Sequence, residues 1–161
     1  MNLLSPIAIG SMQLKNRMVL SPMTTNYGND DRTVSERLIA FHETLAKGGV
    51  GLITVEVCTV DVKQKYQPQS LTLGSDEFIA GHRRPTDRLH QYGAKVQPQI
   101  THPGPESLIW LYHGEQSVGP SVVLGASTSI PSRALAIEEL DGNERSSNIN
   151  FCGDEAGPKR R

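Results

Sequence analysis

The chain has 161 residues and a mass of 17.6 kDa, which suits one domain with a modest hydrophobic core. Its formal net charge of −1 gives no bulk field for nucleic acid or a membrane surface, so we expect neither as a partner. Cys58 and Cys152 are too few for a disulfide framework and match no metal-binding spacing. We find no signal peptide and no apolar run long enough for a bilayer, and we expect a cytoplasmic protein.

The first thirty residues predict a hairpin followed by a strand. Residues 6–14 alternate apolar and polar side chains around Gly10-Ser11, which is typical of a short hairpin. Residues 17–21 then predict a strand that ends at Pro22, because proline has no N–H for a sheet ladder. The small polar residues after Pro22 therefore form a loop at the carboxyl end of that strand, where α/β folds place ligands.

Residues 33–57 predict a helix followed by a buried strand. Thr33 and Glu36 fit a capping box, in which the threonine hydroxyl accepts a free amide and the glutamate reaches back. Apolar residues recur at helical spacing up to the glycines at 48–49, which end the helix. Residues 50–57 form an apolar, β-branched run, typical of a parallel strand buried on both faces. Together these segments predict a right-handed βαβ unit.

Residues 58–75 predict a long polar loop that is functional or disordered. A second helix and strand follow this loop. We expect a helical segment from Ser75 to about Tyr92, with the helix proper beginning near Pro85, since proline suits a first turn. Residues 94–100 predict a third strand, in which Pro98 indicates an edge position or pairing that has already ended. The charges at 30–32 and 82–84 are interpreted as solvated.

Beyond Thr101 the helical and strand periods are lost. Turn-rich segments surround a short aromatic patch at 109–113, and residues 132–140 could start a helix. Residues 141–161 are nearly all polar, and we expect this tail to be disordered.

Four motifs occur in a fixed order along residues 1–140. They are Lys-Asn-Arg-x-Val-x-Ser-Pro-Met-Thr at 15–24, the glycine-rich run 47–53 with Glu56, the segment 93–104, and Gly119-Pro120-Ser121 with 130–133 and 138–139. In this order they resemble the Old Yellow Enzyme family of FMN-dependent NAD(P)H:flavin oxidoreductases, and 102–107 is most similar to the 2,4-dienoyl-CoA-reductase-like branch.

The resemblance implies the N-terminal portion of a TIM (β/α)8 barrel, with about three βα units after a capping hairpin and the barrel incomplete. It divides the chain into a partial FMN-binding barrel region, residues 1–140, and a tail at 141–161 that matches nothing in the family. FMN is then expected over the carboxyl-terminal mouth, taking hydride from NAD(P)H and delivering it to an activated alkene of a small-molecule substrate.

The same resemblance implies roles for individual residues. Pro22, Met23 and Thr24 would lie along the isoalloxazine, with the Thr24 hydroxyl tuning the flavin potential through a hydrogen bond. Val57 would pack beside the pyrimidine ring, and the Gln99 amide would pair with its O2/N3 edge. The alternative for Met23 is an ordinary core position, and for Thr24 and Gln99 a polar side chain at a strand end.

Tyr27 and His102 are candidates for substrate contact. Tyr27 lies one position from the place where some family members carry a substrate-contacting tyrosine, and His102 stands in the loop after the third strand. For His102 the alternative is a structural role beside Pro103.

The His/Asn pair that polarises the substrate in the family, and the loops that grip the flavin phosphate, have no counterpart in this sequence. Its catalytic residues are therefore unknown, and we expect the isolated chain to be weakly active or inactive. An open three-stranded sheet has unpaired edges, so a homo-oligomer or a complementing chain is expected. Three interpretations stay open: a truncated FMN oxidoreductase region, an inactive remnant or interaction module without flavin, and the N-terminal subunit of a split flavoenzyme.

Overall fold

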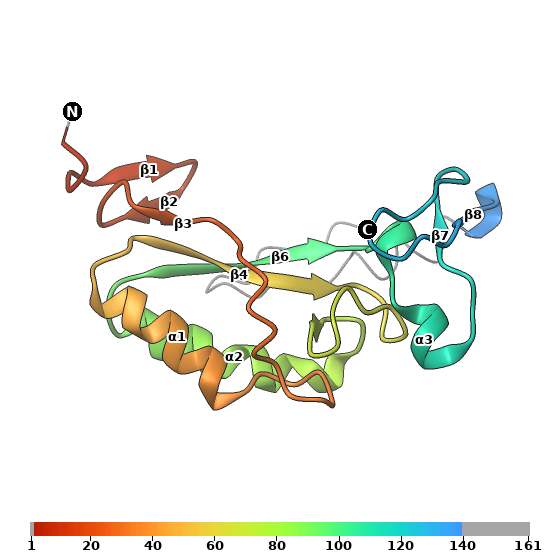
Figure 1. Cartoon of the computed structure of the whole chain (residues 1–161). Coiled ribbons are helices and arrows are strands. Elements are labelled where there is room, and N and C mark those ends of the chain that lie inside the picture. The colour runs from red at the N-terminus through yellow and green to blue at the C-terminus, as the bar shows by residue number, and fades with distance from the viewer. Residues whose placement is uncertain (1, 140–161) are drawn as a thin grey trace.

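The computed structural model describes residues 2–139 and has two layers, a parallel sheet and two helices on one of its faces (Figure 1). The predicted tail at 141–161 and Cys152 lie outside the described residues. In chain order the elements are β1 (Ile7–Ile9), β2 (Met12–Leu14), β3 (Val19–Leu20), α1 (Glu36–Lys47), β4 (Leu52–Thr59), β5 (Leu71–Thr72), α2 (Ile79–His90), β6 (Lys95–Thr101), α3 (Ile109–His113), β7 (Val118–Gly119) and β8 (Arg133–Ala134).

The predicted hairpin is confirmed. Strands β1 and β2 pair antiparallel with Ile9 opposite Met12, and Gly10 in the turn has a φ of 57°, a conformation that glycine adopts at little cost. The hairpin lies at the amino end of the sheet, and residues 102–139 lie at the other end (Figure 1).

Strand β4 is the centre of the sheet, and all eight of its residues are buried. Strand β6 pairs with it in parallel from Leu52 to Thr59. The other edge is shared by two short strands, because β3 pairs with Leu52 and Ile53 while β5 pairs with Cys58 and Thr59. The first strand, β3, is thus shorter than the sequence predicts. Strand β5 pairs with the far part of the same edge of β4, which β3 does not reach.

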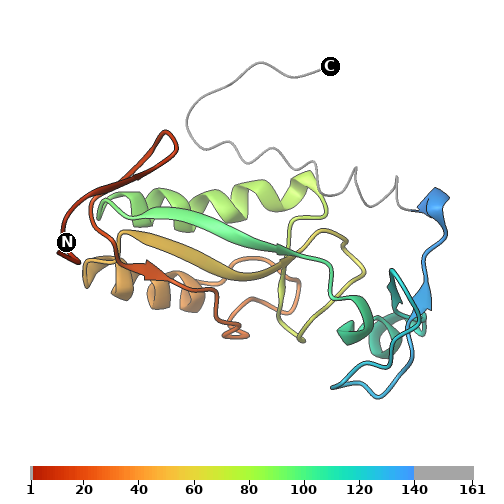
Figure 2. The same cartoon turned by 90° about the horizontal axis from the view of Figure 1, so that it is seen from above.

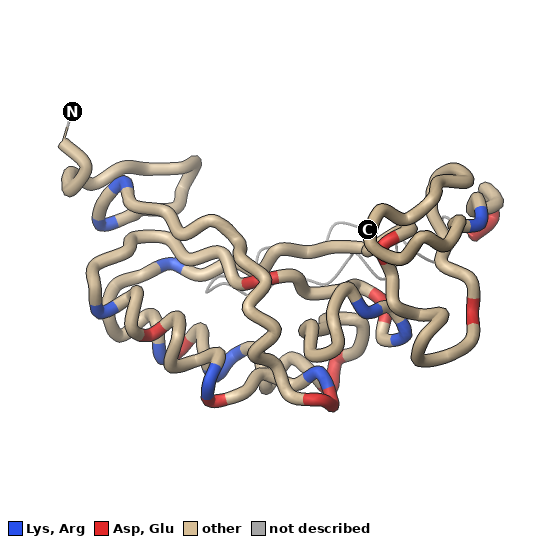
Figure 3. Tube along the Cα trace, in the orientation of Figure 1, with Lys and Arg blue, Asp and Glu red and all other residues tan. Residues whose placement is uncertain are grey.

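Both helices pack on the same face of the sheet, and Figure 2 looks onto the opposite face with the helices behind. Within residues 2–139 no helix covers that opposite face. Charges of both signs are interspersed along the helices (Figure 3), and Arg88 Nε lies 3.2 Å from Glu43 across the α1–α2 contact. The core between helices and sheet is apolar and comprises Val34, Leu38, Ile39, Ala46, Ile53, Val55, Cys58, Leu71, Leu73, Leu89 and Ala94.

The predicted cap of α1 is wrong by two residues. Ser35, in extended conformation, is the N-cap, and its hydroxyl accepts a hydrogen bond from the Leu38 amide at 3.0 Å. The Thr33 hydroxyl instead donates to Asp31 at 2.6 Å, so it is already engaged in the preceding turn. The glycine stop is confirmed, since Gly49 has a φ of 101°.

Helix α2 begins at Ile79, after a 3-10 turn at Asp76–Phe78, and not near Pro85 as predicted. Pro85 lies inside the helix, where it cannot donate to the carbonyl of Gly81. Pro85 and Leu89 are the buried residues of the helix and lie one turn apart, so burial of the proline ring offsets the lost hydrogen bond.

The pairing of β6 decides between the two alternatives predicted for Pro98, an edge position or pairing that has already ended. Pairing with β4 continues beyond Pro98 to Thr101, so it has not ended at the proline. In the described part of the chain β6 pairs only with β4, which makes it an edge strand.

Residues 102–139 contain more regular structure than the sequence predicts. They include a 3-10 turn at Gly104–Glu106, the short helix α3 and a parallel pair formed by β7 and β8. The segment from residue 132, which could start a helix by its sequence, instead begins with β8, and helical backbone starts only at Ile137. Among residues 2–139, no helix has the length and apolar character needed to cross a lipid bilayer.

The revised cap is testable by substitution. We expect Ser35→Ala to lower the free energy of unfolding by about 1 kcal/mol, because it removes the acceptor for the Leu38 amide. Thr33→Ala is the control and should cost less, since its hydroxyl caps no helix. Urea denaturation measures both, and a larger loss in Thr33→Ala would contradict the observed cap.

Candidate functional site

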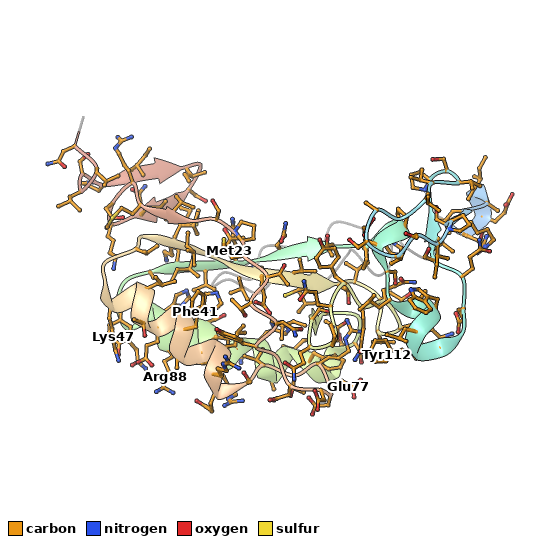
Figure 4. All side chains as sticks on the ribbon, viewed as in Figure 1. Met23, Phe41, Lys47, Glu77, Arg88 and Tyr112 are labelled. Carbon is orange, nitrogen blue, oxygen red and sulfur yellow. The ribbon has the colours of Figure 1, made fainter. Side chains whose placement is uncertain are left out.

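The carboxyl ends of β3, β4 and β6 bring together the residues predicted to face a flavin. Val57 and Gln99 are register partners on β4 and β6. The loop after β3 crosses β4 beside them, since the Thr25 amide donates to Glu56 at 2.5 Å. Met23 is 64% exposed and lies on the side of the sheet opposite Phe41 of α1 (Figure 4).

Two polar side chains at this mouth have no hydrogen-bond partner among the described residues. Thr24 and Gln99 are both half-buried, and within residues 2–139 neither the Thr24 hydroxyl nor the Gln99 amide makes a hydrogen bond. Gln97, two residues earlier on β6, donates to the Thr54 hydroxyl at 3.2 Å instead. Among residues 2–139, the mouth thus carries one hydroxyl and one side-chain amide whose hydrogen-bonding capacity is unused.

A β-bulge in β4 shapes the same region. Val55 pairs with Pro98 and Val57 with Gln99, so Glu56 has no register partner. Its side chain is 0% exposed, and its Oε2 accepts hydrogen bonds from the amide and the hydroxyl of Thr25. Oε1 is buried and has no partner in the described chain. Burial raises the pKa of Glu56, and the two bonds from Thr25 oppose this shift.

Arg32 is buried, and its interpretation as a solvated charge is wrong. Its side chain is 5% exposed, and its φ of 71° turns it toward the loop after β4. The guanidinium donates to the carbonyls of Ser70 at 3.3 Å and Leu71 at 3.2 Å, and also to the Thr59 hydroxyl. Burial lowers the pKa of Arg32 to about 10. Several donors on one rigid group thus hold the loop to the strand end.

The loop between β4 and α2 is correspondingly ordered. Residues 70–73 are buried and include β5, so the predicted polar loop is partly a strand. A side chain at Gly28 would collide with the Gln69 carbonyl, which shows how closely the loops after β3 and β4 pack. His82 lies 2.9 Å from the Thr72 carbonyl and Arg84 pairs with Glu36, so the charges at 82–84 are not simply solvated.

The two candidates for substrate contact are engaged within the chain. The Tyr27 ring packs edge-on against Phe41 at 6.0 Å and under the guanidinium of Arg37 at 3.8 Å, on the α1 side of the molecule. His102 Nδ1 accepts the Gly104 amide at 3.2 Å, and burial lowers the pKa of the ring. The fold thus supplies a structural role for each, and substrate contact by either stays a prediction.

Comparison with known proteins identifies the family. The family model described as NADH:flavin oxidoreductase / NADH oxidase matches residues 2–145. The chain belongs to this family. It is 39% identical over 141 residues to an NADH oxidase of Thermoanaerobacter brockii, an alignment that covers 87% of this chain and 22% of that protein. It is 35% identical over 132 residues to an NADH:fumarate oxidoreductase of Klebsiella pneumoniae (strain 342), covering 81% of this chain and 14% of that protein.

The fold agrees with this membership of the NADH:flavin oxidoreductase family. Old Yellow Enzyme from Pichia sp. AKU4542 superposes with a TM-score of 0.81 at 19% identity, covering 90% of this chain and 40% of that one. The resemblance to Old Yellow Enzymes is therefore confirmed. The parallel pairings of β3 and β6 with β4, together with helices α1 and α2, are the N-terminal portion of a (β/α)8 barrel, with β3, β4 and β6 as its first strands. The chain spans about a quarter or less of the curated relatives named above.

Sequence reasoning missed Arg32 and Glu56 as residues that organise the mouth. A signal for Glu56 was present, because it is the one charged residue in an apolar strand, and buried charges are seldom tolerated without partners. Arg32 had no comparable signal, since it stands among charged residues in a polar stretch.

The role of Arg32 can be tested by Arg32→Lys. A lysine ammonium cannot reach all the acceptors that the planar guanidinium of Arg32 bonds at once. We therefore expect a loss of about 3 kcal/mol in the free energy of unfolding. Faster amide hydrogen exchange over residues 60–73 should accompany the loss. Arg84→Lys, at a half-exposed pair, is the control and should leave exchange in this loop unchanged. Equal behaviour of the two variants would exclude the clamp.

The buried Glu56 carboxyl predicts a pH dependence. Its pKa is higher in the folded than in the unfolded chain, so folding retains a proton that the unfolded chain loses. The contribution of Glu56 to stability should therefore fall as pH rises from about 4.3 through the raised folded-state pKa. Denaturation of wild type and Glu56→Gln from about pH 4 to about pH 8 should show this decline only in wild type. Parallel pH curves would contradict it.

Proposed function

We propose that this chain forms the isoalloxazine-facing part of an FMN-dependent oxidoreductase, in which hydride passes from NAD(P)H through FMN to an activated alkene of a small-molecule substrate. The observation that carries the proposal is the convergence of Met23, Thr24, Val57 and Gln99 at one end of the sheet, with Met23 on the face opposite the helices. Family membership supports the flavin chemistry.

The residues present fit a planar ring with polar edges. Met23 and Pro22 offer apolar surface on the open face, and Val57 is buried beside them in the strand. The Gln99 amide can donate to one ring atom and accept from the next, which suits a carbonyl and an N–H side by side. FMN, when bound, supplies hydride transfer, while the protein supplies orientation and electrostatics.

Thr24 has a distinct part in this arrangement. Its hydroxyl has no partner within residues 2–139, so it is free to hydrogen-bond the edge of a bound ring. A hydrogen bond that strengthens as negative charge develops on that edge favours the reduced form. We therefore assign Thr24 as the residue that tunes the potential.

The open sheet supports a second proposal, that a further chain or segment completes the barrel. Within the described residues β6 has an unpaired edge, and the face opposite the helices is uncovered. Large apolar side chains are exposed nearby, among them Val19, Met23 and Ile100. Unpaired edges and exposed apolar surface are the features through which chains associate. A homo-oligomer and a complementing C-terminal subunit both satisfy this requirement.

A flavin titration tests the first proposal. All the candidate residues would contact the isoalloxazine ring, which riboflavin and FMN share. We therefore expect the two flavins to bind this chain with affinities that agree within a few-fold. Gln99→Ala should weaken both by about tenfold, the worth of one good hydrogen bond. Gln97→Ala is the matched control, because Gln97 lies on the same strand and its amide is already bonded to Thr54. Flavin fluorescence quenching reports the affinity.

The contrary outcomes are equally definite. Absence of binding by the well-folded chain at millimolar FMN would favour the inactive remnant or interaction module. Equal losses in Gln99→Ala and Gln97→Ala would remove Gln99 from the site. Light scattering on the purified protein then distinguishes a homo-oligomer from a split enzyme. A homo-oligomer forms from this chain alone, whereas a split enzyme requires its second chain.

A further inference from the structure

The loop after β3 leaves the sheet before it reaches the mouth. Strand β3 ends at Leu20, and Pro22 has no N–H to continue the ladder. The next fixed point is Thr25, whose amide and hydroxyl both donate to Glu56 Oε2. Met23 and Thr24 therefore lie between two fixed points, the end of β3 and the carboxyl group of Glu56.

We propose that Glu56 is a positioning residue, which holds Thr25 against the bulge of β4 and thereby fixes Met23 and Thr24 over the mouth. The inference deepens the proposed function and rests on it only for the identity of the ligand. Glu56 touches no ligand in this account, since its side chain is 0% exposed, and it acts through Thr25.

The bulge explains why the side chain of Glu56 is available to bind the loop from β3. Val55 pairs with Pro98, and the register between β4 and β6 shifts by one residue immediately afterwards. Glu56 is the residue left unpaired by that shift. A bulge re-aims the side chain it carries, and here the side chain faces the loop from β3. The bulge in β4 thus determines where the loop from β3 is held.

A carboxyl group suits this task because one of its oxygens can accept two hydrogen bonds at once. Glu56 Oε2 receives both donors of Thr25, and the Thr25 hydroxyl in turn accepts the Tyr27 amide at 3.2 Å. A short chain of hydrogen bonds therefore runs from β4 into the loop. The cost is a second carboxyl oxygen, Oε1, that is buried without a partner in residues 2–139. Such a cost indicates that the group has a role that an apolar side chain could not fill.

Amide hydrogen exchange tests the proposal without any flavin. In Glu56→Ala the hydrogen-bonded amides of residues 22–27, those of Thr25 and Tyr27, should exchange at least about tenfold faster, which corresponds to about 1.4 kcal/mol, while β4 and β6 keep their protection. Glu56→Gln retains an acceptor oxygen and should restore protection to within about threefold of wild type. Glu43→Gln, which alters another buried carboxylate, at the α1–α2 contact, is the control and should leave 22–27 unchanged.

Thr25→Val keeps the test decisive if Glu56→Ala does not fold. It removes the hydroxyl donor but leaves the amide, so exchange over 22–27 should rise by a smaller factor with β4 unaffected. Unchanged exchange over 22–27 in the folded variants would overturn the proposal. Loss of protection in 22–27 and β4 to the same extent would also overturn it, because Glu56 would then be an ordinary core residue.

A riboflavin titration of the same variants completes the experiment. Weaker binding in Glu56→Ala, with recovery in Glu56→Gln, is the expected result for a positioning residue of the flavin site. Equal binding by wild type and Glu56→Ala would show that the loop is held for another purpose and would overturn the link to the site. If wild type binds no riboflavin, the proposed function fails, and the exchange data still decide whether Glu56 holds the loop.

Discussion

The burial of β4 is the constraint on which the rest of the structure depends. Every residue of this strand is buried, and β3, β5 and β6 all pair with it. Helices α1 and α2 cover one face through Ile53 and Val55. A strand buried in this way must satisfy its polar groups internally, which explains why its charged residue and its hydroxyls have such specific partners. The candidate site is built from those partners.

One departure from regular pairing connects the fold to the site. The bulge at Glu56 interrupts β4 where the loop from β3 meets the strand. Glu56 binds this loop, and further along the strand Thr59 binds Arg32, which in turn holds the loop that contains β5. Two buried side chains of opposite charge thus hold two different loops at the same strand end.

The architecture could be predicted from sequence because it follows from local periodicity. Apolar spacing located α1 and β4, and the motif around Pro22 located the mouth. The cap at Ser35 was missed because the Thr33 hydroxyl is engaged by Asp31 in the preceding turn. The helix running through Pro85 was missed because local propensity there yields to tertiary packing of Pro85 and Leu89. Arg32 could not be identified, because burial of a charge depends on long-range partners that the surrounding polar residues do not reveal.

The central claim is that the ends of β3, β4 and β6 form one ligand-binding mouth. The most direct test is a two-dimensional NMR spectrum of the full chain recorded with increasing riboflavin. The account predicts shifts concentrated at Met23, Thr24, Val57 and the Gln99 side-chain amide, with α1 and α2 nearly unaffected. Shifts confined to the outer faces of the helices, or spread evenly over the exposed apolar residues, would contradict it.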